Sequence, residues 1–163
     1  SLFSMGAYIA DINNDGYPDI YVTDMLPEDE GRLKAKTSFE SWERYQGNVN
    51  KGYYHQFLRN ALQLNRGPIT NQNTGEPEYH FSEISRLAGV HATDWSWGAL
   101  IADFDNDGYK DLFISNGIKR RPNDMDYINF ISSDSAQRHY GYEAFIENMP
   151  SYWSPGEPPV PRN

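Results

Sequence analysis

The stretch Ala102–Ser115 (ADFDNDGYKDLFIS) places four aspartates, an asparagine and a glycine directly before an apolar segment. The stretch Ala10–Thr23 (ADINNDGYPDIYVT) repeats this arrangement 92 residues earlier. When Gly6–Met25 is laid over Gly98–Gly117, ten of the twenty positions are identical, and the apolar positions of the loop and of the segment after it exchange only for other apolar residues. Such a repeat indicates one structural unit used twice, and repeats at a fixed spacing are typical of array architectures.

Each copy is predicted to form a strand, a turn and a second strand. The Asp/Asn/Gly cluster favours the turn, and the β-branched and aromatic residues after it favour a strand. Two further strands are expected at Ala61–Asn65 and Tyr79–Ile84, with a turn-forming loop from Pro68 to Pro77 between them. Residues 61–117 are therefore predicted to form a four-stranded antiparallel unit, whereas residues 1–25 hold half of one.

Two parts of the chain depart from this β pattern. Thr37–Tyr45 has the spacing of a capping box followed by one apolar helical face, and Asn123–Asn148 has weaker helical spacing. The tail from Pro150 to Asn163 carries five prolines, which favour an extended chain. We therefore expect a helical insertion in residues 26–60 and a helical segment with a proline-rich tail in residues 118–163.

The composition excludes several classes of function. A net charge of −9 argues against a nucleic-acid-binding protein, and no apolar run approaches the roughly 20 residues of a membrane span. The chain has no cysteine, and its four histidines are not paired at metal-ligand spacing, so no zinc site is expected. Neither a nucleophile elbow nor a phosphate loop is present. The sequence therefore predicts a noncatalytic protein.

The negative charge is concentrated in the two loops, where oxygen-bearing side chains alternate. Numbered from the first aspartate, positions 1, 3, 5 and 9 carry carboxylate or amide oxygens, position 6 is glycine, and the tyrosine at position 7 can offer only its backbone carbonyl. This pattern suits a hard cation with about six to eight oxygen ligands, and it favours calcium over magnesium. The side chains are Asp11, Asn13, Asp15 and Asp19 in the first loop and Asp103, Asp105, Asp107 and Asp111 in the second.

Two other kinds of loop share part of this pattern. Asn-Asp-Gly is also a common hairpin turn, which would explain a single copy. Two complete copies favour a cation, because the clustered carboxylates repel one another by roughly 1 kcal/mol or more per close pair when they are not neutralised. In an EF-hand, position 12 is acidic and lies within a flanking helix, but here it is Val22 or Ile114 within an apolar strand. The loop is therefore predicted to close at position 9 on a β-hairpin.

The pattern Asp-x-(Asp/Asn)-x-Asp-Gly-x-x-Asp between strands resembles the FG-GAP/VCBS repeat of calcium-binding β-propellers, which include those of integrin α subunits. The segments Thr23–Pro27, Gly52–Gln56, Leu87–Val90 and Asp94–Trp97 resemble the bacterial surface branch related to cartilage acidic protein. The resemblance covers about residues 5–117. It implies two calcium ions, one held by Asp11, Asn13, Asp15, the Tyr17 carbonyl and Asp19, the other by Asp103, Asp105, Asp107, the Tyr109 carbonyl and Asp111.

The resemblance also implies a fold. We expect a mainly β protein, a partial β-propeller of about one and a half to two antiparallel blades with helical insertions. Residues 1–25 would be half a blade with the first calcium loop, and residues 61–117 a complete blade with the second. Because a closed propeller needs at least four blades, we expect a piece of a longer propeller. Its open strand edges would be covered by the helical insertions or by self-association with a neighbouring copy.

The function implied by the resemblance is a noncatalytic, calcium-stabilised module that binds a protein or glycan. Its expected location is extracellular or on a bacterial cell surface, with outer-membrane association. The alternative is a fragment of a calcium-dependent polysaccharide-processing enzyme, with candidate carboxylates at Asp24, Glu83, Asp94 and Glu143, and His91 near Asp94. The aromatic residues suggest a sugar-stacking platform or a core, and the core is favoured except at Tyr53 and Tyr54. They are Trp42, Tyr53, Tyr54, Trp95, Trp97 and Trp153.

Overall fold

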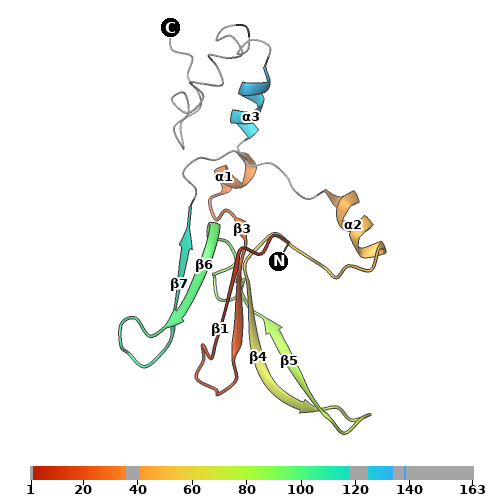
Figure 1. Ribbon diagram of the computed structural model, residues 1–163, viewed down its shortest axis with the longest axis vertical. Coiled ribbons are helices and arrows are strands. Elements are labelled where there is room, and N and C mark those ends of the chain that lie inside the picture. The colour runs from red at the N-terminus through yellow and green to blue at the C-terminus, as the bar shows by residue number, and fades with distance from the viewer. Residues whose placement is uncertain (1, 36–40, 118–124, 134–137, 139–163) are drawn as a thin grey trace. The chain divides into compact units, whose positions relative to one another are not determined.

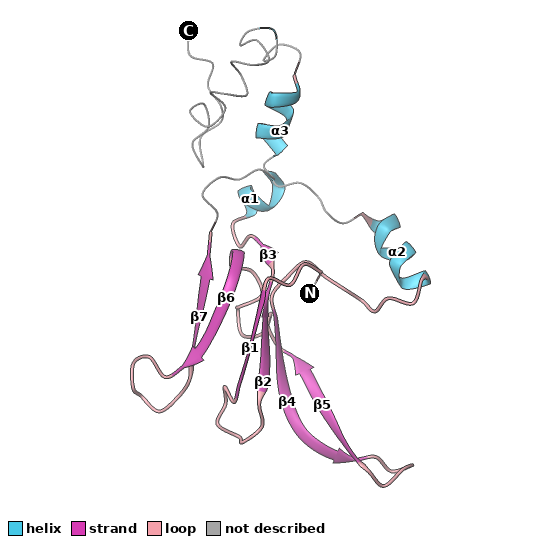
Figure 2. Cartoon of the chain, in the orientation of Figure 1, coloured by secondary structure: helices cyan, strands magenta, loops and turns pink. Residues whose placement is uncertain are grey.

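The computed structural model of the protein describes residues 2–35, 41–117, 125–133 and 138. These residues form a mainly β protein with two antiparallel sheets (Figure 2). The chain divides into two compact units, of which the first comprises residues 1–29 and 42–117 and the second residues 30–41 and 118–163. Both sheets belong to the first unit.

The larger sheet has four strands in the order β1-β2-β4-β5, and the smaller sheet has three in the order β3-β6-β7 (Figure 1). The strands of the larger sheet are β1 (Gly6–Ala10), β2 (Asp19–Thr23), β4 (Ala61–Thr70) and β5 (Pro77–Glu83). Those of the smaller sheet are β3 (Met25–Leu26), β6 (Asp94–Ala102) and β7 (Asp111–Asn116). The two copies of the repeat are the β1–β2 and β6–β7 hairpins. Ala10 pairs with Asp19 and Ala102 with Asp111, so both loops begin and end at the same point of the repeat.

The strand partners correct the predicted grouping of residues 61–117 in one four-stranded unit. β4 pairs with β2 through Tyr21 and Leu62, so the four-stranded sheet is built from residues 6–83. The β6–β7 hairpin pairs instead with the short β3. The long insertion before β4 does not prevent its pairing with β2, because the entropic cost of closing a loop grows only slowly with length.

β4 and β5 are longer than the sequence predicted. β4 continues to Thr70 and β5 begins at Pro77, so part of the expected loop from Pro68 belongs to the sheet. The register shifts between Asn65 and Pro68. A bulge of this kind accommodates a proline, which has no N–H to donate to a neighbouring strand.

Helices occur in both stretches where the sequence predicted them. They are α1 (Glu30–Ala35), α2 (Trp42–Asn50) and α3 (Met125–Ser132). α2 extends beyond the predicted Tyr45, whereas the residues predicted to cap it, Thr37 and Glu40, lie outside the described residues. Residues 139–148 of the predicted helical stretch Asn123–Asn148 and the proline-rich tail also lie outside them. No helix in the described part of the chain is long and apolar enough to cross a membrane.

The core of the first unit lies between the two sheets. Tyr21 and Leu62 from the larger sheet are buried together with Ala99 and Ile101 from the smaller one. The hydroxyl of Tyr21 donates to the carbonyl of Val90 at 2.8 Å, and burial raises the pKa of Tyr21 to about 12. Tyr21 therefore acts as a neutral core residue with a satisfied polar group.

A buried asparagine connects the segments around this core. Asn60 is fully buried; its Oδ1 accepts the N–H of Asp24 at 2.7 Å and its Nδ2 donates to Thr93 at 2.6 Å. Asn60 thus joins the end of β2, the start of β4 and the segment before β6. A buried polar side chain whose groups are all hydrogen-bonded favours a single arrangement of the elements that it connects.

Candidate metal centre

The two loops have the same backbone conformation. At position 4, Asn14 and Asn106 have φ angles of 60° and 62°, and at position 6, Gly16 and Gly108 have φ angles of 89° and 91°. These are left-handed conformations, which glycine adopts without strain and asparagine tolerates better than most residues. The Asn-Asp-Gly segment common to both copies therefore sets the path of the loop.

The aspartates at the ends of each loop hold that path in place. The two carboxylate oxygens of Asp11 accept the N–H groups at positions 5 and 6, at 3.0 and 2.9 Å, and those of Asp103 do the same at 3.1 and 2.9 Å. At position 9, Asp19 and Asp111 each accept the N–H of position 2, at 2.8 and 3.0 Å. The loops are therefore organised by the same hydrogen bonds.

The second loop brings three carboxylates together. One oxygen from each of Asp103, Asp105 and Asp111 lies within 4.8 Å of the other two, and all three residues are exposed. Two oxygens on opposite sides of a calcium ion lie about 4.6–5.2 Å apart, so this spacing suits ligands of a single ion. Asp107 is not part of the group, and its Oδ1 accepts the N–H of Tyr109 at 2.8 Å. The three side chains fit a calcium site in both spacing and chemistry.

The first loop carries one carboxylate fewer. Asn13 replaces the aspartate at position 3, and its Nδ2 donates to Asp15 at 2.9 Å. Asp19 is fully buried, and its second oxygen accepts the N–H of Asn65 at 2.7 Å. Among the described residues of this loop, no three carboxylates converge as they do in the second loop.

The loop geometry favours the charged form of Asp11. Partial desolvation raises the pKa of Asp11, but the N–H groups of Gly16 and Asp15 and the nearby Lys110 ammonium outweigh this effect. The pKa of Asp11 therefore lies below its ordinary value. A carboxylate that is held ionised by donors on one side is prepared to accept a cation on the other.

The sequence did not predict the bridge between the two loops. Asn14 Nδ2 donates to the Gly108 carbonyl at 3.0 Å, and Lys110 Nζ donates to Asn14 Oδ1 at 2.8 Å. The loop of the β1–β2 hairpin and the loop of the β6–β7 hairpin are therefore neighbours, at the same end of the two hairpins (Figure 1). The sequence feature that could have indicated this bridge is position 8 of the loop. The second copy has Lys110 there, among acidic residues, whereas the first copy has Pro18.

The sequence also missed the part of β4 that covers the first loop. Besides its bond to Asp19, Asn65 donates from Nδ2 to the Pro18 carbonyl at 3.1 Å. Gly67 lies beneath the ring of Tyr17, where an added Cβ would lie 2.8 Å from Tyr17 Cε2. These contacts depend on the pairing of β4 with β2, which sequence spacing alone does not show.

Two of the carboxylates considered for catalysis have structural contacts. Asp24 is fully buried, and its Oδ2 accepts the N–H groups of Leu2 and Phe3 at 2.9 and 3.1 Å. Glu83 forms an ion pair with Arg59 at 2.8 Å. Glu143 lies outside the described residues.

The aromatic residues are more exposed than the sequence predicted. Trp97, expected in the core, is 46% exposed and donates from its indole N–H to the Gly117 carbonyl at 2.8 Å. Tyr53 and Tyr54 are exposed, as expected. Trp42 is exposed as well.

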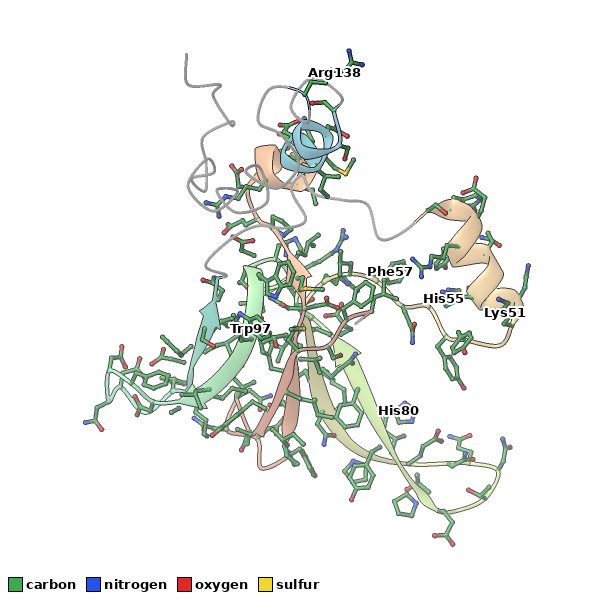
Figure 3. The ribbon with its side chains drawn as sticks, turned by 45° about the horizontal axis from the view of Figure 1, so that its top comes forward. Lys51, His55, Phe57, His80, Trp97 and Arg138 are labelled. Atoms are coloured by element: carbon green, nitrogen blue, oxygen red, sulfur yellow. The ribbon has the colours of Figure 1, made fainter. Side chains whose placement is uncertain are left out.

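A stack of rings connects α2 to the segment that follows it. Its members are Trp42, Tyr45, His55 and Phe57. Figure 3 labels His55 and Phe57.

Comparisons with protein-family models, with curated proteins and with solved structures found no match to the chain. The internal repeat and the geometry of its two loops are therefore the observations that bear on function. Of these, the convergence of three carboxylates in the second loop is the most specific.

Proposed function

We propose that the chain is a noncatalytic calcium-binding repeat module of an extracellular or cell-surface protein. The observation that carries the proposal is the agreement of the two loops in φ angles and hydrogen bonds, together with the three converging carboxylates of the second loop. A plain hairpin turn requires the glycine and the asparagine but not the carboxylates at alternate positions. A divalent cation accounts for those carboxylates.

Calcium would neutralise the loops and hold each hairpin closed. The predicted ligands are one set of oxygens per loop, from Asp11 to Asp19 and from Asp103 to Asp111. Because an ion that binds only the folded state adds to its stability by mass action, the free energy of unfolding should rise with calcium concentration. Extracellular modules bind calcium at roughly 0.1–1 mM, a concentration found outside cells. The proposed location, a bacterial surface with outer-membrane association, rests on the sequence resemblance, and a calcium affinity in this range is what that location requires.

We further propose that the two sheets are blades of a β-propeller. The four-stranded sheet would be a complete blade, and the β6–β7 hairpin the first half of the next. The support is that matching hairpins of two successive sheets pack against each other through the core. In such a scaffold the loops and the exposed aromatic residues are available for a protein or glycan ligand.

Calorimetry with calcium chloride tests the proposal, using the whole chain after treatment with a chelator. We expect binding at roughly 0.1–1 mM and, at about 10 mM free calcium, a gain of roughly 1.4–2.7 kcal/mol per site in the free energy of unfolding. Asp103→Asn should abolish binding at the second loop.

The matched control is Asp126→Asn, which removes the same charge from α3, outside both loops. It should leave calcium binding unchanged. An absence of both heat of binding and stabilisation at about 10 mM calcium, well above the expected dissociation constant, would contradict the proposed function.

A further inference from the structure

Each hairpin of the repeat has two faces, because residues that pair directly across a hairpin point to the same side of the sheet. Tyr8 pairs with Tyr21 in the first hairpin, and Leu100 pairs with Phe113 at the matching positions of the second. These pairs define the bulky face of each hairpin. The opposite, aliphatic face carries Ala7, Ile9, Ile20 and Val22 in the first hairpin and Ala99, Ile101, Leu112 and Ile114 in the second.

One bulky face and one aliphatic face already pack together inside the molecule. Tyr21, from the bulky face of the first hairpin, is buried with Ala99 and Ile101 from the aliphatic face of the second. Tyr8 and Leu112 pack against the same cluster. This contact joins β1 and β2 to β6, and the two hairpins run side by side in Figure 2. The two kinds of face are therefore complementary in shape.

The two remaining faces are exposed at the matching positions. Ile9 is 63% exposed, whereas its counterpart Ile101 is 4% exposed. Phe113 is 55% exposed, whereas its counterpart Tyr21 is fully buried. Phe104, also exposed, contacts Phe113 edge to face at 6.3 Å and enlarges the bulky face. Exposed apolar side chains gathered on one face mark an interaction surface.

We propose that the exposed bulky face of one chain binds the exposed aliphatic face of a second copy, head to tail. Leu100 and Phe113 of one copy would pack on Ala7 and Ile9 of the next, as Tyr8 and Tyr21 pack on Ala99 and Ile101 within the chain. The contact would place the β6–β7 hairpin of one copy on the β1–β2 hairpin of the next, as these two hairpins pack on each other within one chain. It uses the faces of the sheets, in contrast to the strand edges considered from the sequence, and it does not depend on calcium.

A second copy is favoured over other partners because both halves of the contact are on the same chain. Through the sequence repeat, each exposed face carries identical or similar residues at the positions of a face that is already packed inside the molecule. A head-to-tail contact is heterologous, so each copy can bind one neighbour on either side, and the assembly grows into a ring or a chain. A symmetric dimer, by contrast, would join the same face on both copies.

Sedimentation velocity on the whole chain, from about 1 µM to about 1 mM, tests this proposal. We expect the sedimentation coefficient of the wild type to rise with concentration. Ile9→Asp disrupts the exposed aliphatic face and leaves the exposed bulky face able to bind, whereas Phe113→Asp does the reverse. Because the contact needs one face of each kind, each variant alone should stay monomeric. An equimolar mixture of the two should form a dimer of one copy of each and no larger species.

Leu87→Asp is the control, since Leu87 is an exposed apolar residue in a loop outside both hairpins, and it should associate as the wild type does. Circular dichroism establishes that the variants are folded; if Phe113→Asp is not, Leu100→Glu replaces it. A wild type that stays monomeric throughout overturns the proposal. So does a mixture of folded variants that stays monomeric, or a variant that still associates alone.

Discussion

At the level of single residues, the difference between the two loops that bears most directly on a bound cation is at position 3. Asn13 presents one amide oxygen where Asp105 presents a carboxylate, while the backbone conformation around them is the same. Lys110 adds to the difference because its ammonium lies close enough to lower the pKa of Asp11 and therefore repels a cation there. Both effects weaken the first site relative to the second.

Exchanging the two residues at position 3 should reverse this order. Asn13→Asp should tighten calcium binding at the first loop by roughly tenfold, and Asp105→Asn should weaken it at the second by a similar factor, since even in bulk water a unit charge at about 4 Å is worth roughly 1 kcal/mol. Asp103→Asn removes the second site, so calorimetry on this background with and without Asn13→Asp measures the first site alone. Asp11→Asn removes the first site, so calorimetry on that background with and without Asp105→Asn measures the second. Equal calcium affinities in these four proteins would show that the charge at position 3 does not set the order of the two sites.

At the level of elements, local features could be predicted from the sequence and long-range pairing could not. The loops could be predicted because the residues from Asp103 to Asp111 form their turn and its hydrogen bonds among themselves. The two hairpins follow from the loops. The partner of β2 could not be predicted, because Leu62 is 41 positions from Tyr21 and pairs with it across an insertion that carries no pairing signal. The contacts of Asn65 and Gly67 depend on that pairing.

Gly67 offers a test of how β4 supports the first loop. Its φ of +74° and the nearby Tyr17 ring should both penalise a side chain, so Gly67→Ala should lower the free energy of unfolding by roughly 2 kcal/mol or more. Gly75→Ala is a matched control, since Gly75 has the same φ of +74° but no atom within 4 Å of an added Cβ. It should cost only about 1 kcal/mol.

Chemical denaturation measures both costs. The excess cost of Gly67→Ala over Gly75→Ala is assigned to the Tyr17 ring, so it should shrink when both are measured in a Tyr17→Ala background. Equal costs in the wild-type background would mean that the ring moves away freely and that β4 does not constrain the loop.

At the level of the whole molecule, the described sheets leave one bulky face and one aliphatic face exposed. Its core is a contact between a bulky and an aliphatic face, and both outer faces repeat the same two patterns. The acidic loops gather at one end of the hairpins, where Asn14 joins them. The two proposals therefore concern separate parts of the molecule: the stacking concerns the sheet faces, and the binding of calcium concerns the loops.

The dependence of folding on pH belongs to this scale as well. Desolvation raises the pKa of Glu83, but its contact with Ser85, which includes a hydrogen bond from the Ser85 N–H, and the nearby Arg59 guanidinium outweigh it, so the folded-state pKa lies below the ordinary 4.5. A carboxyl whose pKa is lowered by folding stabilises the folded state above its unfolded-state pKa, and this contribution is lost as the pH falls through the folded-state value. Glu83 should therefore stabilise the protein at neutral pH and cease to do so in acid.

Glu83→Gln should lower the free energy of unfolding at pH 7 by about 1 kcal/mol, since it removes an ion pair and weakens the acceptor for the N–H of Ser85. The difference from the wild type should narrow as the pH falls below about 4.5, because the wild-type carboxyl is then becoming protonated. Urea denaturation between pH 3 and pH 7, in buffer that contains a chelator, measures this difference in the free energy of unfolding. Glu76→Gln, at an exposed position, is the control for the change in net charge. A difference that stays constant down to pH 3 would mean that Glu83 acts through its shape and not its charge.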